Sequence, residues 1–150
     1  MLPKWGAIST EGKAYLQPFT GTMKAKYYKE LLEKDFIPEA NQIMPQGVWI
    51  LQQDEAFAHT AKSVTRFLDS YKILILEWPS RSPDLNPMEN IWGILKKKVY
   101  RRNPETFMEL ENAIFEEWDL LDNNEVGRIA ASFPSHLRQV IDRHGSVIDY

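Results

Sequence analysis

The chain has 150 residues, of which 43% are hydrophobic, and a net charge of −3, which together predict one soluble globular domain with enough apolar side chains for a core. It contains no cysteine, which excludes disulfides and thiolate metal sites, and its 3 histidines lack a zinc-ligand spacing, so any bound metal would be held by oxygen. No apolar run reaches the roughly 18 residues of a membrane span, and no secretory signal pattern opens the chain, so an intracellular protein without a membrane partner is predicted.

Two short strands are predicted first, over Lys4–Ser9 and Ala14–Phe19, and the Gly-containing loop between them is typical of an antiparallel hairpin. Apolar residues then recur at helical spacing from Met23 to about Lys34, which predicts a helix. We expect Pro38 to end this pattern, because proline disrupts a helix interior.

A strand, a helix and a second strand are predicted next. Val48–Leu51 is short, apolar and rich in strand-forming residues, which indicates a central strand, and Asp54 stands at its exit. Thr60 is the expected cap of a helix that runs to about Ser70. Ile73–Leu76 has the pattern of a buried strand, and a strand, helix, strand unit of this kind implies a parallel pair.

Helices are predicted for the rest of the chain. Asn86 as cap and Pro87 at the first helical position start one helix. Its inward-facing stripe is formed by Met88, Ile91, Trp92, Leu95 and Val99. A second amphipathic helix is expected from Pro104 through Trp118, and a last helical region lies around residues 137–141. This order of elements predicts an α/β fold.

Two carboxylates, Asp54 and Glu89, are the candidate catalytic and metal-binding residues. In an ordinary structural interpretation, Asp54 accepts backbone N–H groups at a strand exit, and Glu89, three residues after Asn86, closes a capping box. The alternative is that an acid at a strand end and an acid at a helix start share divalent metal ions. Each acid alone favours the ordinary interpretation, and the coincidence of the two favours the metal site.

Basic residues are concentrated just after Glu89. Residues 62–102 carry 9 basic and 4 acidic groups, whereas residues 103–150 carry 3 and 10. The candidate DNA-binding residues are Lys96, Lys97, Lys98, Arg101 and Arg102. Such a cluster either follows a phosphate backbone or complements the dipole at a helix end, and charge alone favours the second interpretation.

The strings that carry the two acids are Gly47-Val-Trp-Ile-Leu-Gln-Gln-Asp54 and Ser82-Pro-Asp-Leu-Asn-Pro-Met-Glu89. They resemble the sequences around the second and third catalytic acids of mariner-type transposases, which cut DNA with an acidic triad. Trp5-Gly-Ala-Ile-Ser resembles the second strand of that family, and residues 132–145 resemble its C-terminal segment. The resemblance runs along nearly the whole chain and implies a ribonuclease-H-like mixed sheet flanked by helices.

The resemblance also implies that the first acid, and the central strand that bears it, belong upstream of Met1. Residues 1–150 are therefore interpreted as a single catalytic domain truncated at its N-terminus. By resemblance, Asp54 and Glu89 bind Mg²⁺ or Mn²⁺ in a two-metal site that lacks its bridging acid. We expect the isolated chain to be inactive in cleavage, and to be marginally stable or to self-associate.

DNA, as transposon ends and target, is the partner that the resemblance implies, with a nuclear location in a eukaryote and a homodimer left open. Beside metal-type acids, DNA contact by the basic cluster becomes as well supported as the helix-end interpretation. Glu55-Ala-Phe57 stands where the family has Asn-Ala-Pro, which puts an extra negative charge next to Asp54. His59 is assigned a structural hydrogen-bonding role rather than a catalytic one, and Asp84 is assigned to turn chemistry.

Two alternative functions remain open at this stage. One is a non-catalytic, transposon-derived remnant that acts as a DNA- or protein-interaction module. The other is a ribonuclease-H-type nuclease that cuts RNA in hybrids, and the transposon-like strings argue against it. Metal-dependent cleavage of DNA separates these functions.

Overall fold

A computed structural model describes residues 1–44, 49–76, 85–133 and 135 of the chain. The chain forms two compact units, one made of Met1–Thr20 with Pro83–Tyr150 and the other of Gly21–Ser82. In the described ranges, no helix is long and apolar enough to span a membrane. The helical region expected around residues 137–141 lies outside the described residues.

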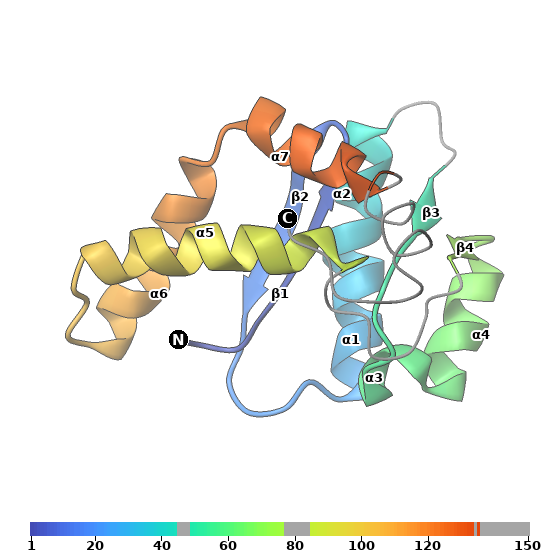
Figure 1. The fold of residues 1–150 in the computed structure, drawn as a ribbon. Coiled ribbons are helices and arrows are strands. Elements are labelled where there is room, and N and C mark those ends of the chain that lie inside the picture. The colour runs from blue at the N-terminus through green and yellow to red at the C-terminus, as the bar shows by residue number, and fades with distance from the viewer. Residues whose placement is uncertain (45–48, 77–84, 134, 136–150) are drawn as a thin grey trace, which may run out of the picture. The chain divides into compact units, whose positions relative to one another are not determined.

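The first unit begins with the antiparallel hairpin of β1 (Lys4–Ser9) and β2 (Gly12–Pro18), as predicted (Figure 1). The register pairs Lys4 with Pro18 at one end and Ser9 with Gly12 at the other, with an irregularity after Ala7. The second strand starts two residues earlier than expected. Gly12 has a φ of 118°, which a glycine adopts at little cost, so the chain can enter the strand directly from the turn.

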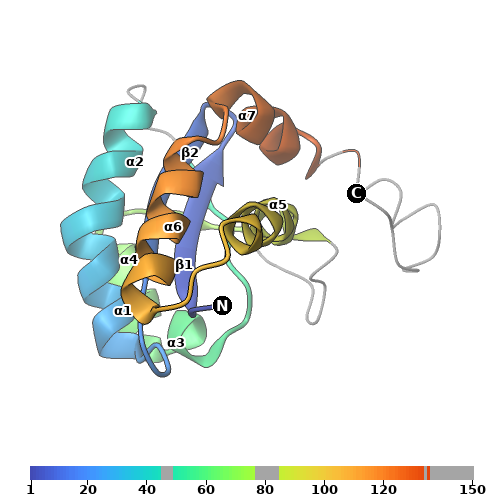
Figure 2. The same ribbon diagram turned by 90° about the vertical axis from the view of Figure 1, so that its left-hand side faces the viewer.

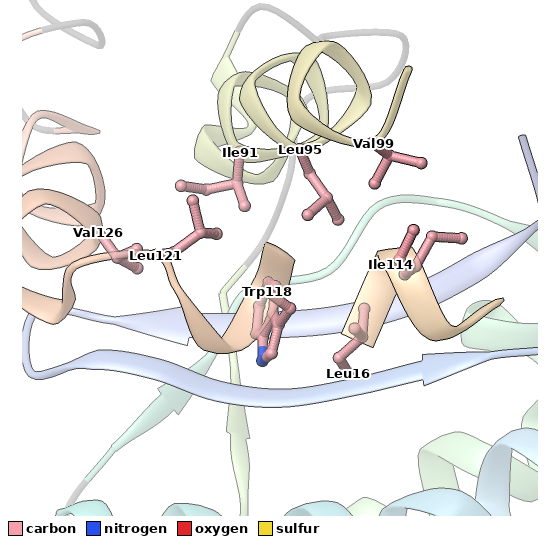
Figure 3. Close-up of a cluster of buried hydrophobic side chains, with 9 residues drawn as sticks. Leu16, Ile91, Leu95, Val99, Ile114, Trp118, Leu121 and Val126 are labelled. Atoms are coloured by element: carbon pink, nitrogen blue, oxygen red, sulfur yellow. The ribbon is translucent and has the colours of Figure 1, made fainter. Parts of the chain in front are cut away.

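Three helices pack on this hairpin: α5 (Pro87–Arg101), α6 (Phe107–Asp119) and α7 (Asn123–Ala131). Helix α5 contacts β1, α6 contacts β2, and α7 contacts both strands (Figure 2). Their apolar side chains form one core in which Trp118 and Leu16 lie between the helices and the hairpin (Figure 3). The buried members of this core are Leu16, Ile91, Leu95, Val99, Ala113, Ile114, Trp118, Leu121 and Val126.

Capping side chains decide where these helices begin. The prediction for α5 is confirmed, because Oδ1 of Asn86 accepts the backbone N–H of Met88 at 3.0 Å and Pro87 opens the helix. The predicted start of α6 at Pro104 is wrong. Thr106 and Glu109 form a capping box that starts the helix at Phe107.

Helix α7 was not predicted from the sequence. Asp122 caps it by accepting the backbone N–H of Glu125 at 3.0 Å. An Asp followed three residues later by a Glu is a known signal for a helix start, and it could have revealed α7. The sequence analysis missed it because the apolar stripe of this segment is short.

The second unit contains a long helical segment that does not stop at Pro38. Helix α1 (Ala25–Leu31) continues through a π-helical turn (Leu32–Phe36) into α2 (Ile37–Ile43). The prediction that Pro38 ends the helix is therefore wrong. Proline is tolerated in the first turn of a helix, and the π-helical turn makes Pro38 a first-turn residue of α2.

The same unit contains two short parallel strands, β3 (Ile50–Leu51) and β4 (Leu74–Ile75), and the predicted parallel pairing is confirmed. Between them lie α3 (Phe57–Thr60) and α4 (Lys62–Ser70). Thr60 ends α3 instead of capping α4, so the predicted cap is wrong. The apolar side chains of α4, Val64, Phe67 and Leu68, are buried.

Gly6 on β1 allows a close approach to the first turns of α5. A Cβ atom at this position would lie 2.5 Å from Cη2 of Trp92 and 3.2 Å from Cε of Met88. The indole of Trp92 has little room to move, because it packs against the core and its ring centroid lies 6.2 Å from that of Trp118. Glycine at position 6 therefore sets the distance between β1 and the start of α5.

Replacement of Gly6 tests this constraint. Gly6→Ala should lower the free energy of unfolding by about 1–3 kcal/mol, because the added methyl group overpacks a rigid contact. Gly93→Ala is the matched control. Position 93 has open space within 4 Å and lies inside α5, so alanine there should raise stability by about 0.5–1 kcal/mol. Urea unfolding of both variants provides the measurement, and equal effects at the two positions would contradict the close-packing argument.

Candidate active site

Asp54 lies three residues after the end of β3, at the strand exit predicted from the sequence. Its Oδ1 atom accepts the backbone N–H of Ala56 at 3.0 Å. The same oxygen lies 2.6 Å from Nδ1 of His59, although this nitrogen has no partner in good hydrogen-bond geometry among the described residues. The Asp54 side chain is 56% exposed, so its carboxylate is held at one oxygen and accessible to solvent.

The surroundings of Asp54 favour its charged form. The contact with His59 has the largest effect and lowers the pKa of the Asp54 carboxyl below its ordinary value. Partial burial opposes this effect, and the hydrogen bond from the backbone of Ala56 adds to it. Asp54 is therefore ionised at neutral pH, which a metal ligand requires.

A buried tyrosine supports this arrangement from α1. The hydroxyl of Tyr28 donates to Oε1 of Gln53 at 2.7 Å, and Nε2 of Gln53 donates to the backbone carbonyl of His59 at 3.3 Å. The rings of Tyr28 and His59 lie 4.3 Å apart between centroids. Tyr28 is completely buried, so the loop that carries Asp54 is tied to the buried interior of its unit. The structural role predicted for His59 agrees with these contacts.

Glu89 lies in the first turn of α5 and is exposed. The cap of this helix is the side chain of Asn86, which binds the backbone N–H of Met88. Among the residues that the structure describes, the Glu89 carboxylate forms no capping box and no ion pair. The ordinary role considered for Glu89 is therefore not seen, and its carboxylate is available for a ligand.

The structure places the two acids in different units, Asp54 in residues 21–82 and Glu89 in the other, so their proximity stays a prediction. Within residues 1–44, 49–76, 85–133 and 135, no group of three or more acidic or histidine side chains is arranged to hold a metal ion. Asp84 lies outside these ranges. Carboxylate oxygens are nevertheless the ligands that Mg²⁺ and Mn²⁺ prefer, so both side chains suit hard cations.

The basic cluster lies on the C-terminal half of α5, and its members differ in environment. Lys96, Lys97 and Arg101 are exposed and Lys98 is partly buried. Arg102 is different, because its guanidinium binds the carboxylates of Glu116 and Glu117 on α6. The bond to Glu116 has the largest effect and the bond to Glu117 adds to it. Together they raise the pKa of the Arg102 guanidinium above its ordinary value. Within the described part of the chain, none of the other four forms an ion pair.

Lys4 at the start of β1 is half-buried and lies close to α5. Its ammonium group lies 4.7 Å from the centroid of the Trp92 ring. Burial lowers the pKa of Lys4, the charge of Glu89 opposes this shift and the charge of Lys96 adds to it. Lys4 was not predicted as a site residue because it stands 85 positions before Glu89 and belongs to no motif.

Comparison with known proteins identifies relatives of the chain. The model of the DDE superfamily endonuclease family matches residues 4–111, a range that contains both Asp54 and Glu89. The chain is 32% identical over 148 residues to the transposable element Tc3 transposase of Caenorhabditis elegans, covering 97% of this chain and 45% of that protein. It is also 32% identical over 150 residues to the Tcb1 transposase of Caenorhabditis briggsae, covering 97% of this chain and 53% of that protein. The chain thus spans about half the length of these relatives.

Solved structures share the fold. The Mos1 transposase catalytic domain, in a structure with raltegravir and Mn, has a TM-score of 0.84 at 18% identity, covering 93% of this chain and 74% of that one. The Mos1 mariner paired-end complex with Mn has a TM-score of 0.85 at 18% identity, covering 95% of this chain and 43% of that one. The ribonuclease-H-like α/β fold and the resemblance to mariner-type transposases, both predicted from the sequence, are confirmed.

Removal of one hydroxyl group tests the support of Asp54. Tyr28→Phe leaves Oε1 of Gln53 without its donor and should lower the free energy of unfolding by about 1 kcal/mol. Tyr100→Phe makes the same chemical change at a position that is 52% exposed, and should change stability by less than about 0.5 kcal/mol. Chemical unfolding measures both variants, and a loss at Tyr28 no larger than at Tyr100 would contradict the proposed support.

The lowered pKa of Asp54 predicts a pH dependence of stability. A carboxyl group whose pKa is lower in the folded state contributes stability above its unfolded pKa of about 3.9. This contribution is lost as the pH falls through the folded pKa. Asp54→Asn removes the titrating group, so the variant should lose less stability than the parent chain between about pH 5 and pH 3. Urea midpoints across this range provide the test, and parallel curves for the two proteins would refute it.

Proposed function

Because the chain belongs to the DDE superfamily endonuclease family, we propose that it forms part of the catalytic domain of a mariner-type transposase, which cuts DNA and joins the cut ends to a target. The observation that carries this proposal is the family match across residues 4–111. It includes Asp54, which follows a strand, and Glu89, which lies in the first turn of a helix, and both acids were predicted at these places in the fold. The confirmed fold supports the same function.

Asp54 and Glu89 are the proposed ligands of Mg²⁺ or Mn²⁺. The solved Mos1 catalytic domains include structures with Mn and with Mg. When bound, two such cations activate the attacking oxygen and stabilise the leaving oxygen of a phosphodiester. In this chain, His59 and Ala56 hold Oδ1 of Asp54, which leaves the other carboxylate oxygen as the ligand atom. Glu89 offers an exposed carboxylate that its own helix does not use.

DNA is the proposed partner, and the exposed cations on α5 are its proposed contacts. Lys96, Lys97 and Arg101 are exposed and follow Glu89 on the same helix, and Lys98 beside them is partly buried, so these four are the proposed phosphate contacts. Arg102 contributes less to this surface, because two carboxylates of α6 already neutralise it. A homodimer remains part of the proposal by analogy, since Mos1 forms a paired-end complex.

The second candidate is a module that binds DNA without cutting it. Glu55 favours this candidate, because it adds an exposed negative charge directly beside Asp54, where the family has Asn. A second carboxylate next to a metal ligand changes the charge that the cations experience. Metal binding and DNA nicking, measured on the same preparations, distinguish the two functions.

Manganese binding tests the roles of the two acids. Loss of a hydrogen-bond partner of a metal ligand typically weakens metal affinity by about 10-fold to 100-fold, and loss of a ligand should cost at least as much. Asp54→Asn and Glu89→Gln should therefore each weaken Mn²⁺ binding by about 10-fold or more in calorimetric titrations. Asp69→Asn, at an exposed acid on α4, is the control and should leave binding unchanged.

Nicking of supercoiled DNA completes the experiment. The expected result for the 150-residue chain is Mn²⁺ binding without nicking, because only two of the three family acids are assigned in it. Nicking that Asp54→Asn abolishes would show that two acids suffice. Equal Mn²⁺ affinity in all four proteins would overturn the assignment of Asp54 and Glu89 as ligands.

A further inference from the structure

The cations of α5 do not share one face of the helix. Each residue of an α-helix turns the side chain by about 100°, so residues seven or eleven positions apart lie within about 20° of each other. Lys96 and Tyr100 therefore lie on the same face as Glu89. Lys98 stands nine positions after Glu89, so its side chain points about 180° away from that of Glu89 around the helix axis. Only Lys96 continues the face of the acid.

The side of α5 that carries Lys98 and Arg102 lies opposite Glu89 and contacts α6 through Arg102. Arg102 follows Lys98 by one helical turn and binds Glu116 and Glu117 of α6. Glu117 is buried, so this pairing ties the end of α5 to α6. Arg102 therefore serves the fold, whereas the first turns of α5, which carry Glu89, lie beside β1 where Trp92 approaches Gly6.

Strand β1 adds a second cation to the face of Glu89. The ammonium group of Lys4 lies over the ring of Trp92, at 4.7 Å from its centroid, and the ammonium of Lys96 lies 5.7 Å from the centroid of Tyr100. Aromatic faces attract cations and hold long lysine side chains in place. Because Trp92 also contacts Gly6, the backbone of β1 and the helix fix the position of Lys4.

The two ammonium groups repel each other, since the charge of Lys96 makes the charged form of Lys4 less favourable. Glu89 attracts Lys4 but does not pair with it within the 4.0 Å of an ion pair, and one carboxylate cannot neutralise two cations. If Glu89 held a metal ion, its negative charge would be shared with that cation and would compensate Lys4 less. Phosphates bound by the two lysines would relieve this repulsion.

We propose that Lys4 of β1 and Lys96 of α5 both contact the phosphate backbone of DNA, on the face of α5 that carries Glu89. This inference rests on the proposed function and extends it, because it adds a residue from β1 to the DNA surface. It also assigns different roles to the cations of α5. Lys96 binds DNA on the face that carries Glu89, whereas Arg102 pairs with Glu116 and Glu117 and holds α5 against α6. The aromatic rings of Trp92 and Tyr100 keep both ammonium groups in place before DNA arrives.

The salt dependence of DNA binding tests this proposal. The affinity of the chain for a fluorescently labelled duplex is measured at increasing NaCl concentration, with EDTA present so that metal bridges are absent. Each phosphate contact contributes about 0.9 to the slope of log affinity against log salt concentration. Lys4→Gln and Lys96→Gln should each lower this slope by up to about 1, equally for unrelated DNA sequences. The double variant should lose about the sum of the single losses, because each lysine makes its own phosphate contact.

Two further variants serve as controls. Lys4→Arg keeps the charge and should retain the slope of the parent chain. Lys29→Gln removes a lysine that also lies over an aromatic ring, Phe67 at 5.8 Å, but that belongs to the other unit and is not part of the proposed pair. It should leave the slope unchanged. Thermal unfolding of every variant shows that the fold is retained.

The outcomes separate this inference from the proposed function. If the parent chain binds DNA with a clear salt dependence and Lys4→Gln has the same slope, the inference is wrong and the proposed function stands. If Lys96→Gln has the slope of the parent chain, the assignment of Lys96 to this surface is wrong. If the parent chain does not bind DNA, the DNA partner and this inference both fail, while the manganese titrations still report on the two acids.

Discussion

The close contact between Gly6 of β1 and Trp92 of α5 is the constraint on which the first unit depends. It brings a strand and a helix together at a distance that any larger residue would increase. This contact and the cap of Asn86 fix the start of α5, so the side chain of Glu89 extends from the first turn in a defined direction. The same contact places Lys4 over the indole ring. The absence of a side chain at Gly6 thus helps to position Glu89 and Lys4, which are far apart in the sequence.

Asp54 depends on a different kind of support. Its loop is irregular, and hydrogen bonds rather than close packing hold it in place. Tyr28 is buried in the helical part of the unit and reaches the loop through Gln53, whose other end binds the backbone of His59. His59 in turn lies against the carboxylate of Asp54. A carboxylate held in this way keeps its charge and orientation without being buried, and both properties suit a metal ligand.

Local signals in the sequence predicted most elements, and the assignment of Asp54 and Glu89 as metal ligands stays a prediction. The cap of α5 was predicted because Asn86 and Pro87 act within one turn, and the hairpin was predicted because its loop is short. The failures concern interactions that no local pattern reveals. Lys4 and Tyr28 reach the candidate site only through the tertiary fold, and Pro38 was misread because its effect depends on the helical turn before it. The proximity of Asp54 and Glu89 remains a prediction from the sequence.

The π-helical turn of Leu32–Phe36 is equivalent to one extra residue within a continuous helix. In an uninterrupted α-helix, Ile37 would lie about 140° from Leu32, and after the extra residue is absorbed the angle falls to about 40°. Both side chains are buried, as is Ala40 one turn later. Residues 33–35 are exposed, so the extra residue of the π-helical turn lies on the solvent side of the helix. Loss of one of them, such as Lys34, would convert the segment to a plain α-helix with the same buried stripe, whereas loss of a residue in α1 would turn that stripe out of register. The π-helical turn is therefore a position at which a one-residue deletion can shorten the helix without rotating its buried side chains.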